Sequence, residues 1–382
     1  MLFLVLKEVI TIKKILFGIT SLTLGGAERV LIDISNKLSE KYDITIFSIY
    51  DNGELKNDLN KNVKFKALYN CRYDELTKLQ KMWIPIKILL FSKIIYNKKI
   101  KQNYDTEIAF LEGPITRLFS TKNKDVHKIA WIHNDIEKVF GNDLKSKIKK
   151  YIDKNIYKKY NDLVFVSQDN MEKFQNIYND LNTENMHVIY NYIDKDLVIK
   201  KSNYNIKVEF DYNSINFLTV CRLVKQKAID RFIRVHSKLI KQGLKHKVYI
   251  IGDGPEKENL QKLIKQENVE DTFILLGKKE NPYPYIKNAN YFCLLSEFEG
   301  YGMVLEEAKI LNKPIIITNT AARECIENYP KALILENSED EIYDGLYKLL
   351  NDNDDKIFNN TQTNTEYDNT EKLQKIIELV GD

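Results

Sequence analysis

Short runs of apolar residues recur along the whole chain and alternate with stretches whose apolar positions have helical spacing. Most of these runs are continuously apolar, which is typical of strands buried on both faces of a parallel sheet. Strands that alternate with helices predict an α/β fold. The thirteen expected strands cover 13–20, 43–50, 63–68, 106–112, 128–133, 162–167, 187–194, 216–221, 247–252, 272–277, 291–296, 314–319 and 332–336.

One polar stretch interrupts the alternation near the middle of the chain. We interpret this stretch, residues 196–215, as a linker between two doubly wound domains. The N-terminal Rossmann-like domain is expected to cover 1–195, with residues 1–12 as an extension before its first strand. The C-terminal domain is expected to cover 216–350, and 351–382 to form a polar loop and a last helix. Ligands of such sheets bind outside the carboxyl ends of the strands, so the loops there are the places to search for chemistry.

Length and charge agree with two domains of different character. The 382 residues fit two domains at about 100–200 residues each. Hydrophobic residues make up 43% of the chain, which excludes extensive disorder. Residues 1–195 hold 32 basic and 24 acidic residues, and residues 196–382 hold 26 and 30, so the halves carry +8 and −4. We therefore expect the two domains to have different partners.

Several absences narrow the class of protein. The four cysteines are widely spaced and form neither a disulfide pattern nor a zinc pattern, which is typical of a cytoplasmic protein. We read no signal peptide and no transmembrane helix, because no uninterrupted apolar run of about 18 residues occurs. No metal site is predicted, since Asp352-Asn353-Asp354 lies in an Asn- and Asp-rich tail instead of at a strand end.

Residues 78–101 form a basic amphipathic segment. They include seven lysines and no acidic residue, interleaved with Trp83 and aliphatic residues. Such a segment suits an anionic membrane surface, and a second basic run at 145–160 adds to this interpretation. The alternative is a helix that packs on the core and exposes a lysine face. Nucleic acid is not an expected partner, because no recognition motif accompanies the charge.

Two cations follow the predicted strand that ends at Cys221. Arg222 and Lys227 flank a loop at the carboxyl end of this strand, and cations at that spacing can bind a diphosphate. The alternative is an ordinary solvated loop.

Two carboxylates lie around a glycine-rich turn after the strand at 291–296. Glu299 stands in the turn, and Glu307 lies about one turn into the helix that follows. Carboxylates accept hydrogen bonds from sugar hydroxyls, and amides at a helix start bind anions. Acids favoured by the helix dipole are the alternative, but this does not account for Glu299 beside two glycines. The residues of the turn and helix start are Gly300, Tyr301, Gly302, Met303 and Val304.

Three further motifs also follow predicted strands. Gly25 and Gly26 open a helix, and the alternative for them is a tight turn between strand and helix. His133 ends a strand, and the alternative is a structural histidine. For the sequence GDGPE at 252–256 we favour a structural turn, with proline at a helix start, over a phosphate loop.

Together these segments resemble glycosyltransferase family 4, the retaining transferases of the GT-B fold, over nearly the whole chain. The pattern E-G-[FY]-G-x-x-x-x-E-A is met from Glu299 to Ala308, and R-x-x-x-x-K by Arg222 and Lys227. The GGAERV opening is similar to bacterial enzymes that assemble capsular, O-antigen or other lipid-linked glycans. The family usually has glycine at three positions where this chain differs, Tyr192, Cys221 and Ala228.

The resemblance implies two Rossmann-like domains facing each other across a cleft, and a role for each motif. Arg222 and Lys227 would neutralise the donor diphosphate as it leaves. Glu299 would hold hydroxyls of the transferred sugar, and Glu307 would accept from the ribose. His133 would lie near C6 of the sugar. The amides from Gly302 to Val304 would contact sugar and phosphate, Gly300 and Tyr301 would also belong to the donor site, and Gly25 and Gly26 would let the N-terminal domain close on the donor.

The implied activity is retaining transfer of a sugar from a nucleotide-sugar, by preference a UDP-sugar, to a lipid-linked glycan in bacterial surface polysaccharide biosynthesis. It would need no metal or other cofactor and would take place at the inner face of the cytoplasmic membrane. Two alternatives stay open. One is a sugar-nucleotide epimerase on the same fold, and the other is a non-catalytic GT-B scaffold.

Overall fold

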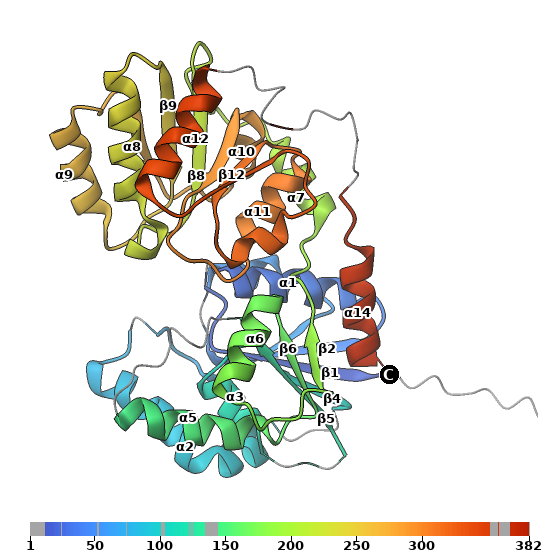
Figure 1. Ribbon diagram of the computed structural model, residues 1–382. Coiled ribbons are helices and arrows are strands. Elements are labelled where there is room, and N and C mark those ends of the chain that lie inside the picture. Colours follow the sequence, from blue (N-terminus) through green and yellow to red (C-terminus); the bar gives the residue numbers. More distant parts are fainter. Residues whose placement is uncertain are drawn as a thin grey trace, which may run out of the picture. The chain divides into compact units, whose positions relative to one another are not determined.

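The computed structural model divides the chain into two compact units (Figure 1). Unit 1 takes residues 1–192 and 370–382, and unit 2 takes residues 193–369. The residues that the structure describes are 12–23, 25–51, 53–73, 75–100, 104–121, 123, 125–133, 144–351, 358 and 367–381.

Unit 1 is built on a seven-stranded sheet with the order β3-β2-β1-β4-β5-β6-β7. All its strand pairs are parallel, as the continuous apolar runs predict. The strands are β1 (Lys14–Ile19), β2 (Asp43–Tyr50), β3 (Lys64–Tyr69), β4 (Thr106–Ala109), β5 (His127–Ile132), β6 (Asp162–Phe165) and β7 (Met186–Val188).

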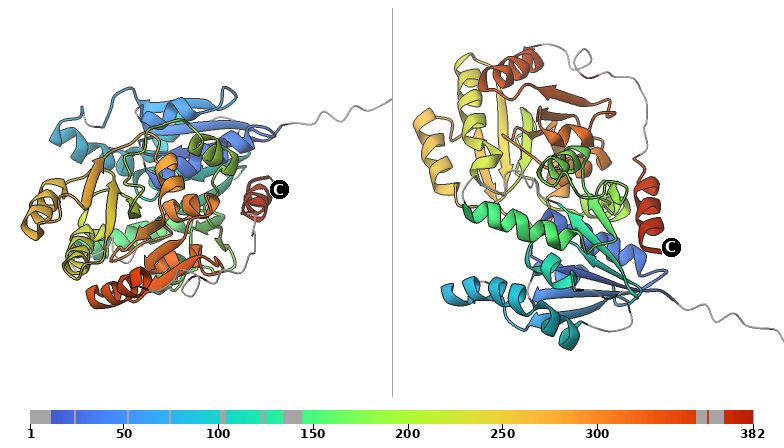
Figure 2. Two further views of the ribbon diagram at one scale, coloured as in Figure 1. Left: turned by 90° about the horizontal axis from the view of Figure 1, so that it is seen from above. Right: turned by 60° about the horizontal axis from the view of Figure 1, so that its bottom comes forward.

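Helices cover both faces of this sheet. Right-handed crossovers place α1 on one face and the helices between later strands on the other, and Figure 2 shows the two layers from further directions. The helices are α1 (Gly26–Leu38), η1 (Glu54–Asp58), α2 (Lys78–Lys99), α3 (Pro114–Phe119), α5 (Leu144–Tyr157), α6 (Gln168–Ile177) and α14 (Thr370–Gly381).

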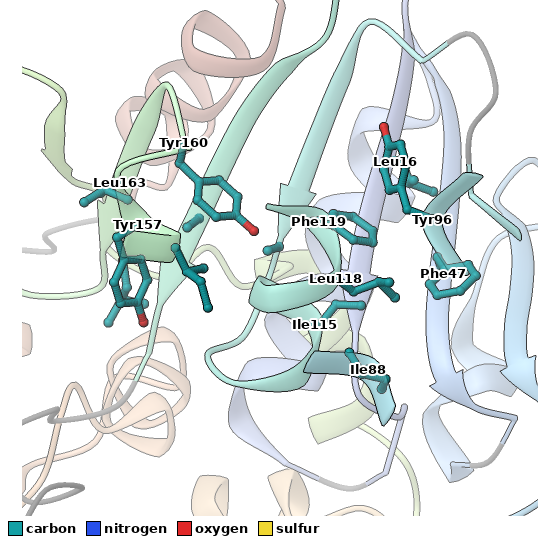
Figure 3. Close-up of a cluster of buried hydrophobic side chains, with 14 of the residues drawn as sticks. Leu16, Phe47, Ile88, Tyr96, Ile115, Leu118, Phe119, Tyr157, Tyr160 and Leu163 are labelled. Carbon is teal, nitrogen blue, oxygen red and sulfur yellow. The ribbon is translucent and has the colours of Figure 1, made fainter. Parts of the chain in front are cut away.

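One hydrophobic core of unit 1 lies between the sheet and helices α2, α3, α5 and α6. Ile115, Leu118 and Phe119 of α3 occupy its middle in Figure 3, between Tyr157 on one side and Phe47 on the other. All of these side chains are buried. Burying a side chain of this size contributes about 1.5–3 kcal/mol, so the short helix α3 is held by packing.

Unit 2 is built on a six-stranded parallel sheet with the order β10-β9-β8-β11-β12-β13. Figure 1 shows α8, α9 and α12 on one face and α7, α10 and α11 on the other. The strands are β8 (Ile215–Val220), β9 (His246–Ile251), β10 (Phe273–Gly277), β11 (Tyr291–Leu294), β12 (Ile315–Thr318) and β13 (Ala332–Leu335). The helices are α7 (Lys195–Ser202), η2 (Lys225–Lys227), α8 (Ile229–Lys241), α9 (Lys257–Glu267), α10 (Tyr283–Asn288), α11 (Met303–Ile310), η3 (Ala321–Cys325) and α12 (Glu339–Asn351).

The structure differs from the sequence expectations around the middle of the chain. The strand expected at 187–194 is β7, which ends at Val188, and α7 occupies part of the stretch interpreted as a linker. Asp194 caps α7, because its side chain accepts the N–H of Leu197 at 2.9 Å. The expected last helix is present as α14, and it belongs to unit 1.

Several other expectations concern absences or peripheral segments. Within the described ranges, none of the helices combines the length and the hydropathy that crossing a membrane requires. The four cysteines are free thiols. The same ranges hold no group of three or more His, Cys, Asp or Glu side chains that could bind a metal ion. The extension before Ile12 and the sequence at 352–354 lie outside the described residues.

Candidate active site

The first part of the candidate site is the loop between β8 and α8 of unit 2. Leu223 anchors this loop, because it is buried and its N–H donates to the carbonyl of Asp253 at 3.0 Å. The guanidinium of Arg222 is exposed, and no hydrogen bond or ion pair of it is found within the described part of the chain. The side chain of Arg222 is therefore accessible to an anionic ligand.

Ala228 ends this loop in a backbone conformation that favours glycine. It stands between η2 and α8 with φ +48° and ψ +36°, in the left-handed region. A residue with a Cβ in this region costs roughly 1–2 kcal/mol relative to the right-handed conformation. The conformation would suit glycine, the residue that the family resemblance implies at this position, without this strain.

The GDGPE segment, residues 252–256, packs against the backbone of the β8–α8 loop. A Cβ at Gly252 would lie 1.8 Å from the carbonyl oxygen of Cys221, and a Cβ at Gly254 would lie 2.3 Å from that of Leu223. The glycines are thus needed for a close backbone contact. The segment has the structural role that the sequence favoured for it.

The second part of the candidate site is the turn after β11, which meets the first part through side chains. Lys227 Nζ forms an ion pair with Glu299 Oε1. The same oxygen accepts the hydroxyl of Ser296 at 2.6 Å. The side chains of Lys227 and Glu299 are 18% and 7% exposed. Two residues 72 positions apart in the sequence are therefore brought together at the carboxyl ends of neighbouring strands.

Backbone contacts hold the two parts together. The N–H of Glu297 donates to the carbonyl of Gln226 at 2.9 Å. The side-chain amide of Gln226 donates in turn to the carbonyl of Phe298 at 2.8 Å. These paired hydrogen bonds make the β8–α8 loop and the β11–α11 turn one structural element.

The glycine-rich turn is held by a buried network of its own. Gly302, the N-cap of α11, has φ +77°, a left-handed conformation that glycine adopts without strain. The hydroxyl of Tyr301 donates to Glu306 Oε1, and Lys309 pairs with Glu306 Oε2 at 3.3 Å. Burial raises the pKa of Tyr301 far above its usual value. The side chain of Tyr301 thus points inward and stabilises the turn, so any donor contact of this residue falls to its backbone.

Glu307, the second predicted carboxylate, has a partner that the sequence analysis missed. The hydroxyl of Tyr283, the first residue of α10, donates to Glu307 Oε1 at 3.1 Å. Tyr283 is 6% exposed. The only sequence signal was an aromatic residue between two prolines in the loop after a strand, which does not indicate a partner 24 residues away.

His133 lies at the carboxyl end of β5 in unit 1. Its backbone N–H donates to Glu112 Oε1 at 2.7 Å, and its ring packs on Phe110 with 4.6 Å between the centroids. Burial lowers the pKa of His133 to about 3, so the imidazole is neutral at physiological pH. Its Nε2 atom is buried without a hydrogen-bond partner among the described residues.

The side-chain carboxylate of Glu28 lies against Gly25 in the turn that opens α1. Gly25 is the N-cap of α1, and a Cβ there would lie 2.2 Å from Glu28 Oε2. Burial raises the pKa of Glu28, although a hydrogen bond to its own backbone N–H opposes this shift. Gly25, Gly26 and His133 belong to unit 1, whereas all other predicted site residues belong to unit 2.

The predicted site residues of unit 2 place charges of both signs at one edge of its sheet. They are an exposed arginine, a lysine–glutamate pair and a second glutamate on a helix start, and groups of these kinds can bind anions and hydroxyls. The two sheets, of seven and six parallel strands with helices on both faces, are those of the GT-B fold. The fold of the chain is therefore GT-B.

Comparison with known proteins shows which families and structures the chain is similar to. Residues 200–367 match the family described as Glycosyl transferases group 1. A Campylobacter jejuni relative, N-acetylgalactosamine-N,N'-diacetylbacillosaminyl-diphospho-undecaprenol 4-alpha-N-acetylgalactosaminyltransferase, is 28% identical over 87% of this chain and 89% of its own length. The O-antigen biosynthesis glycosyltransferase WclY of Escherichia coli is 24% identical over 80% of each chain. The crystal structure of HepE from Anabaena with UDP and glucose has a TM-score of 0.71 at 16% identity, covering 96% of this chain and 98% of that one.

The match over residues 200–367, together with relatives that align with most of the chain, supports a glycosyltransferase. The fold predicted from the sequence is confirmed.

Proposed function

We propose that this protein transfers a sugar from a UDP-sugar to a lipid-linked glycan at an anionic membrane surface, with retention of anomeric configuration and without a metal ion. The observation that carries the proposal is the Lys227–Glu299 pair, with Arg222 on the same loop and Glu307 on α11. It provides groups of the right charge for both ends of a nucleotide-sugar.

Cations at the diphosphate perform the main chemical work. Departure of the nucleoside diphosphate concentrates negative charge on the β-phosphate, and Arg222 and Lys227 are cations on the loop that would meet it. The N–H groups of Met303 and Val304 at the start of α11 add donors there. Loss of one preorganised group of this kind costs roughly 10²–10³ in rate. Two fixed cations supply the charge that a metal ion provides in other transferases.

The carboxylates orient the sugar and the ribose. Glu299, held by Lys227 and Ser296, is suited to accept hydroxyls of the transferred sugar. Retention without a covalent intermediate implies that the acceptor attacks from the face that the diphosphate leaves, and that a phosphate oxygen takes the acceptor's proton. For Gly25, Gly26 and His133 the donor contacts implied by the family resemblance stay predictions. His133→Ala tests one of them in a transfer assay.

Relatives support the choice of donor and acceptor. The name of the Campylobacter jejuni relative includes a diphospho-undecaprenol glycan as acceptor, and the structure of HepE contains UDP and glucose. A polyprenyl-diphosphate glycan is therefore the acceptor that we propose for this chain, and a UDP-sugar the donor.

Helix α2 is the element that we assign to the membrane. Of its apolar residues, only Ile84 and Ile88, together with Tyr96, are buried, so the alternative of an ordinary core-facing helix does not explain the rest. Lysines interleave with the exposed apolar residues, and no acidic residue occurs in the helix. The exposed residues are Leu79, Met82, Trp83, Ile86, Leu90, Phe91 and Ile94.

The donor site is tested by a thermal-shift panel of UDP, GDP, CMP and several UDP-sugars in EDTA. A ligand at 100 times its dissociation constant stabilises the protein by roughly 2.7 kcal/mol. We expect UDP and one UDP-sugar to stabilise the wild type but not Lys227→Ala. Stabilisation that disappears in EDTA would contradict metal independence, and no shift with any nucleotide would favour the scaffold alternative.

The reaction is tested by incubating the stabilising UDP-sugar with and without a polyprenyl-diphosphate-linked glycan. We expect sugar transfer that depends on the acceptor, and an unchanged anomeric configuration in the proton NMR spectrum of the product. A free epimer formed without acceptor would establish the epimerase alternative instead.

Membrane binding is tested by flotation with vesicles of phosphatidylglycerol and of phosphatidylcholine. We expect binding to the anionic vesicles that weakens with salt and is lost in the double variant Trp83→Ala with Leu90→Ala. Tyr212→Ala removes an equally exposed aromatic residue from unit 2 and serves as the control. Equal flotation of both variants would refute the assignment of α2.

A further inference from the structure

Tyr283 is the residue from which we draw an inference beyond the predicted motifs. It lies at the start of α10, directly after the loop that follows β10. In the order of the sheet, β10 is two strands from β8. The loop after β10 therefore emerges at the same edge as the β8–α8 loop, because all strands are parallel and their carboxyl ends meet at one edge.

The position of Tyr283 is fixed by its neighbours. Asn281 Oδ1 accepts the N–H of Tyr283 at 3.3 Å, and its Nδ2 donates to the carbonyl of Lys201 in α7 at 2.8 Å. Pro282 and Pro284 flank the tyrosine and restrict the backbone there. A buried phenol ring on a pinned backbone has little freedom, so its hydroxyl is presented at a defined point.

That hydroxyl donates a hydrogen bond to Glu307 and restricts the rotation of its carboxylate. The terminal torsion of a glutamate side chain is broad and roughly two-fold, so an unrestrained carboxylate samples many orientations. The hydrogen bond from Tyr283 to Oε1 selects one of them. Glu307 is fifth in α11, and its backbone is equally fixed by the helix.

We infer that Tyr283 is a positioning residue for ribose recognition, which orients the Glu307 carboxylate so that it accepts both vicinal hydroxyls of the donor's ribose. The two oxygens of one carboxylate match two neighbouring hydroxyls only when the plane of the carboxylate is set correctly. The residue therefore determines the preference for a ribonucleotide over a deoxyribonucleotide. This inference rests on the proposed function, because it takes the donor to be a nucleotide-sugar.

The test compares the dissociation constants of the nucleoside diphosphate that binds and of its 2'-deoxy and 3'-deoxy analogues, by titration calorimetry. The wild type should prefer the ribonucleotide by roughly tenfold or more, because a hydrogen bond to a charged group contributes about that factor. Tyr283→Phe keeps the ring in place and removes only the hydroxyl. It should weaken the ribonucleotide several-fold and leave the deoxy analogues nearly unchanged, so that the preference shrinks.

Two further variants separate positioning from packing. Tyr285→Phe is the matched control, because Tyr285 is also buried in α10 but its hydroxyl donates to Glu209. It should leave the preference intact. In Glu307→Gln the preference should be lost, and adding Tyr283→Phe to that variant should change nothing more, since both residues act through one interaction.

The outcomes distinguish the inference from the proposal on which it rests. If the wild type binds no nucleotide, the proposed function is wrong and the inference falls with it. If the wild type prefers the ribonucleotide and Tyr283→Phe weakens all three ligands by the same factor, or none of them, the inference alone is overturned. Thermal melting of each variant confirms that the fold is intact.

Discussion

Replacing Lys227 by alanine should reveal two separate roles of this residue. Its ammonium group pairs with Glu299, whose side chain is 7% exposed, and Ser296 then remains as the hydroxyl donor to that carboxylate. Loss of a hydrogen bond to a buried charge costs about 1.5–3 kcal/mol. Because Lys227 itself is 18% exposed, we expect about 2 kcal/mol. At about 2–4 °C per kcal/mol for a unit of this size, the melting temperature of unit 2 should fall by about 4–8 °C.

The double variant Lys227→Ala with Glu299→Gln separates stability from binding. Glutamine is neutral and still accepts the hydroxyl of Ser296, so the double variant leaves no unpaired charge and should regain most of the lost melting temperature. It still lacks the cation for the diphosphate, so it should fail to bind UDP as the single variant does. Circular dichroism melting and calorimetry measure the two properties on the same samples.

A matched control comes from the same short helix. Lys225 is exposed and lies in η2 with Lys227, so Lys225→Ala removes an equal charge from the same loop. It should change neither the melting temperature nor the affinity appreciably. A double variant no more stable than Lys227→Ala, or a Lys227→Ala protein that binds UDP like the wild type, would refute the reasoning.

Two further predictions concern the frame of unit 2. Burial lowers the pKa of His236 to about 2 and that of His246 to about 4, so just below pH 6.5 these imidazoles are protonated only in the unfolded chain. The free energy of unfolding should therefore fall by about 1.4 kcal/mol per pH unit for each imidazole. In His246→Gln this slope, measured by urea unfolding between pH 7 and 5, should be smaller by about 1.4 kcal/mol per pH unit. Gly252→Ala would place a Cβ 1.8 Å from the carbonyl oxygen of Cys221, so it should lower the melting temperature and abolish UDP binding. The control is Gly243→Ala, where nothing lies within 4 Å of the added Cβ, and it should leave UDP binding unchanged. Unaltered UDP binding in Gly252→Ala would contradict the assigned contact.

The sheets could be predicted from the sequence because their strands are buried on both faces. Each expected strand has a counterpart in the structure, since a continuous apolar run leaves little choice of environment. The end of β7 could not be predicted in this way. The apolar residues after Val188 include Ile189 and Ile193, which are buried but lie outside any strand. A hydrophobicity pattern reports burial and does not show where hydrogen bonding between strands stops.

The sequence predicted the residues of the candidate site but not the contacts between their side chains. Motifs directly after strands identified Arg222, Lys227, Glu299 and Glu307, but no local pattern shows that two of them form an ion pair. The role of Tyr301 illustrates the same limit. Its place between two glycines indicated a ligand contact, whereas its hydroxyl is engaged by Glu306 within the turn. Side-chain direction depends on packing across the fold, which local sequence does not specify.

The pairing of Lys227 with Glu299 leads to a last prediction, because the two residues serve adjacent parts of the proposed donor. Lys227 is assigned to the diphosphate and Glu299 to the transferred sugar, yet in the chain alone they bind each other. A diphosphate without a sugar must therefore compete with Glu299 for the ammonium group. A complete nucleotide-sugar also offers sugar hydroxyls to Glu299, and their hydrogen bonds replace the ion pair with Lys227.

Glu299→Gln should consequently affect the two ligands in opposite directions. Without the carboxylate, Lys227 is available to the diphosphate, so UDP should bind at least as tightly as to the wild type. The UDP-sugar should lose roughly tenfold in affinity, because its hydroxyls lose a charged acceptor. Calorimetry with both ligands measures the ratio directly. Equal weakening of UDP and UDP-sugar would mean that Glu299 stabilises the loop as a whole and does not contact the sugar of the donor.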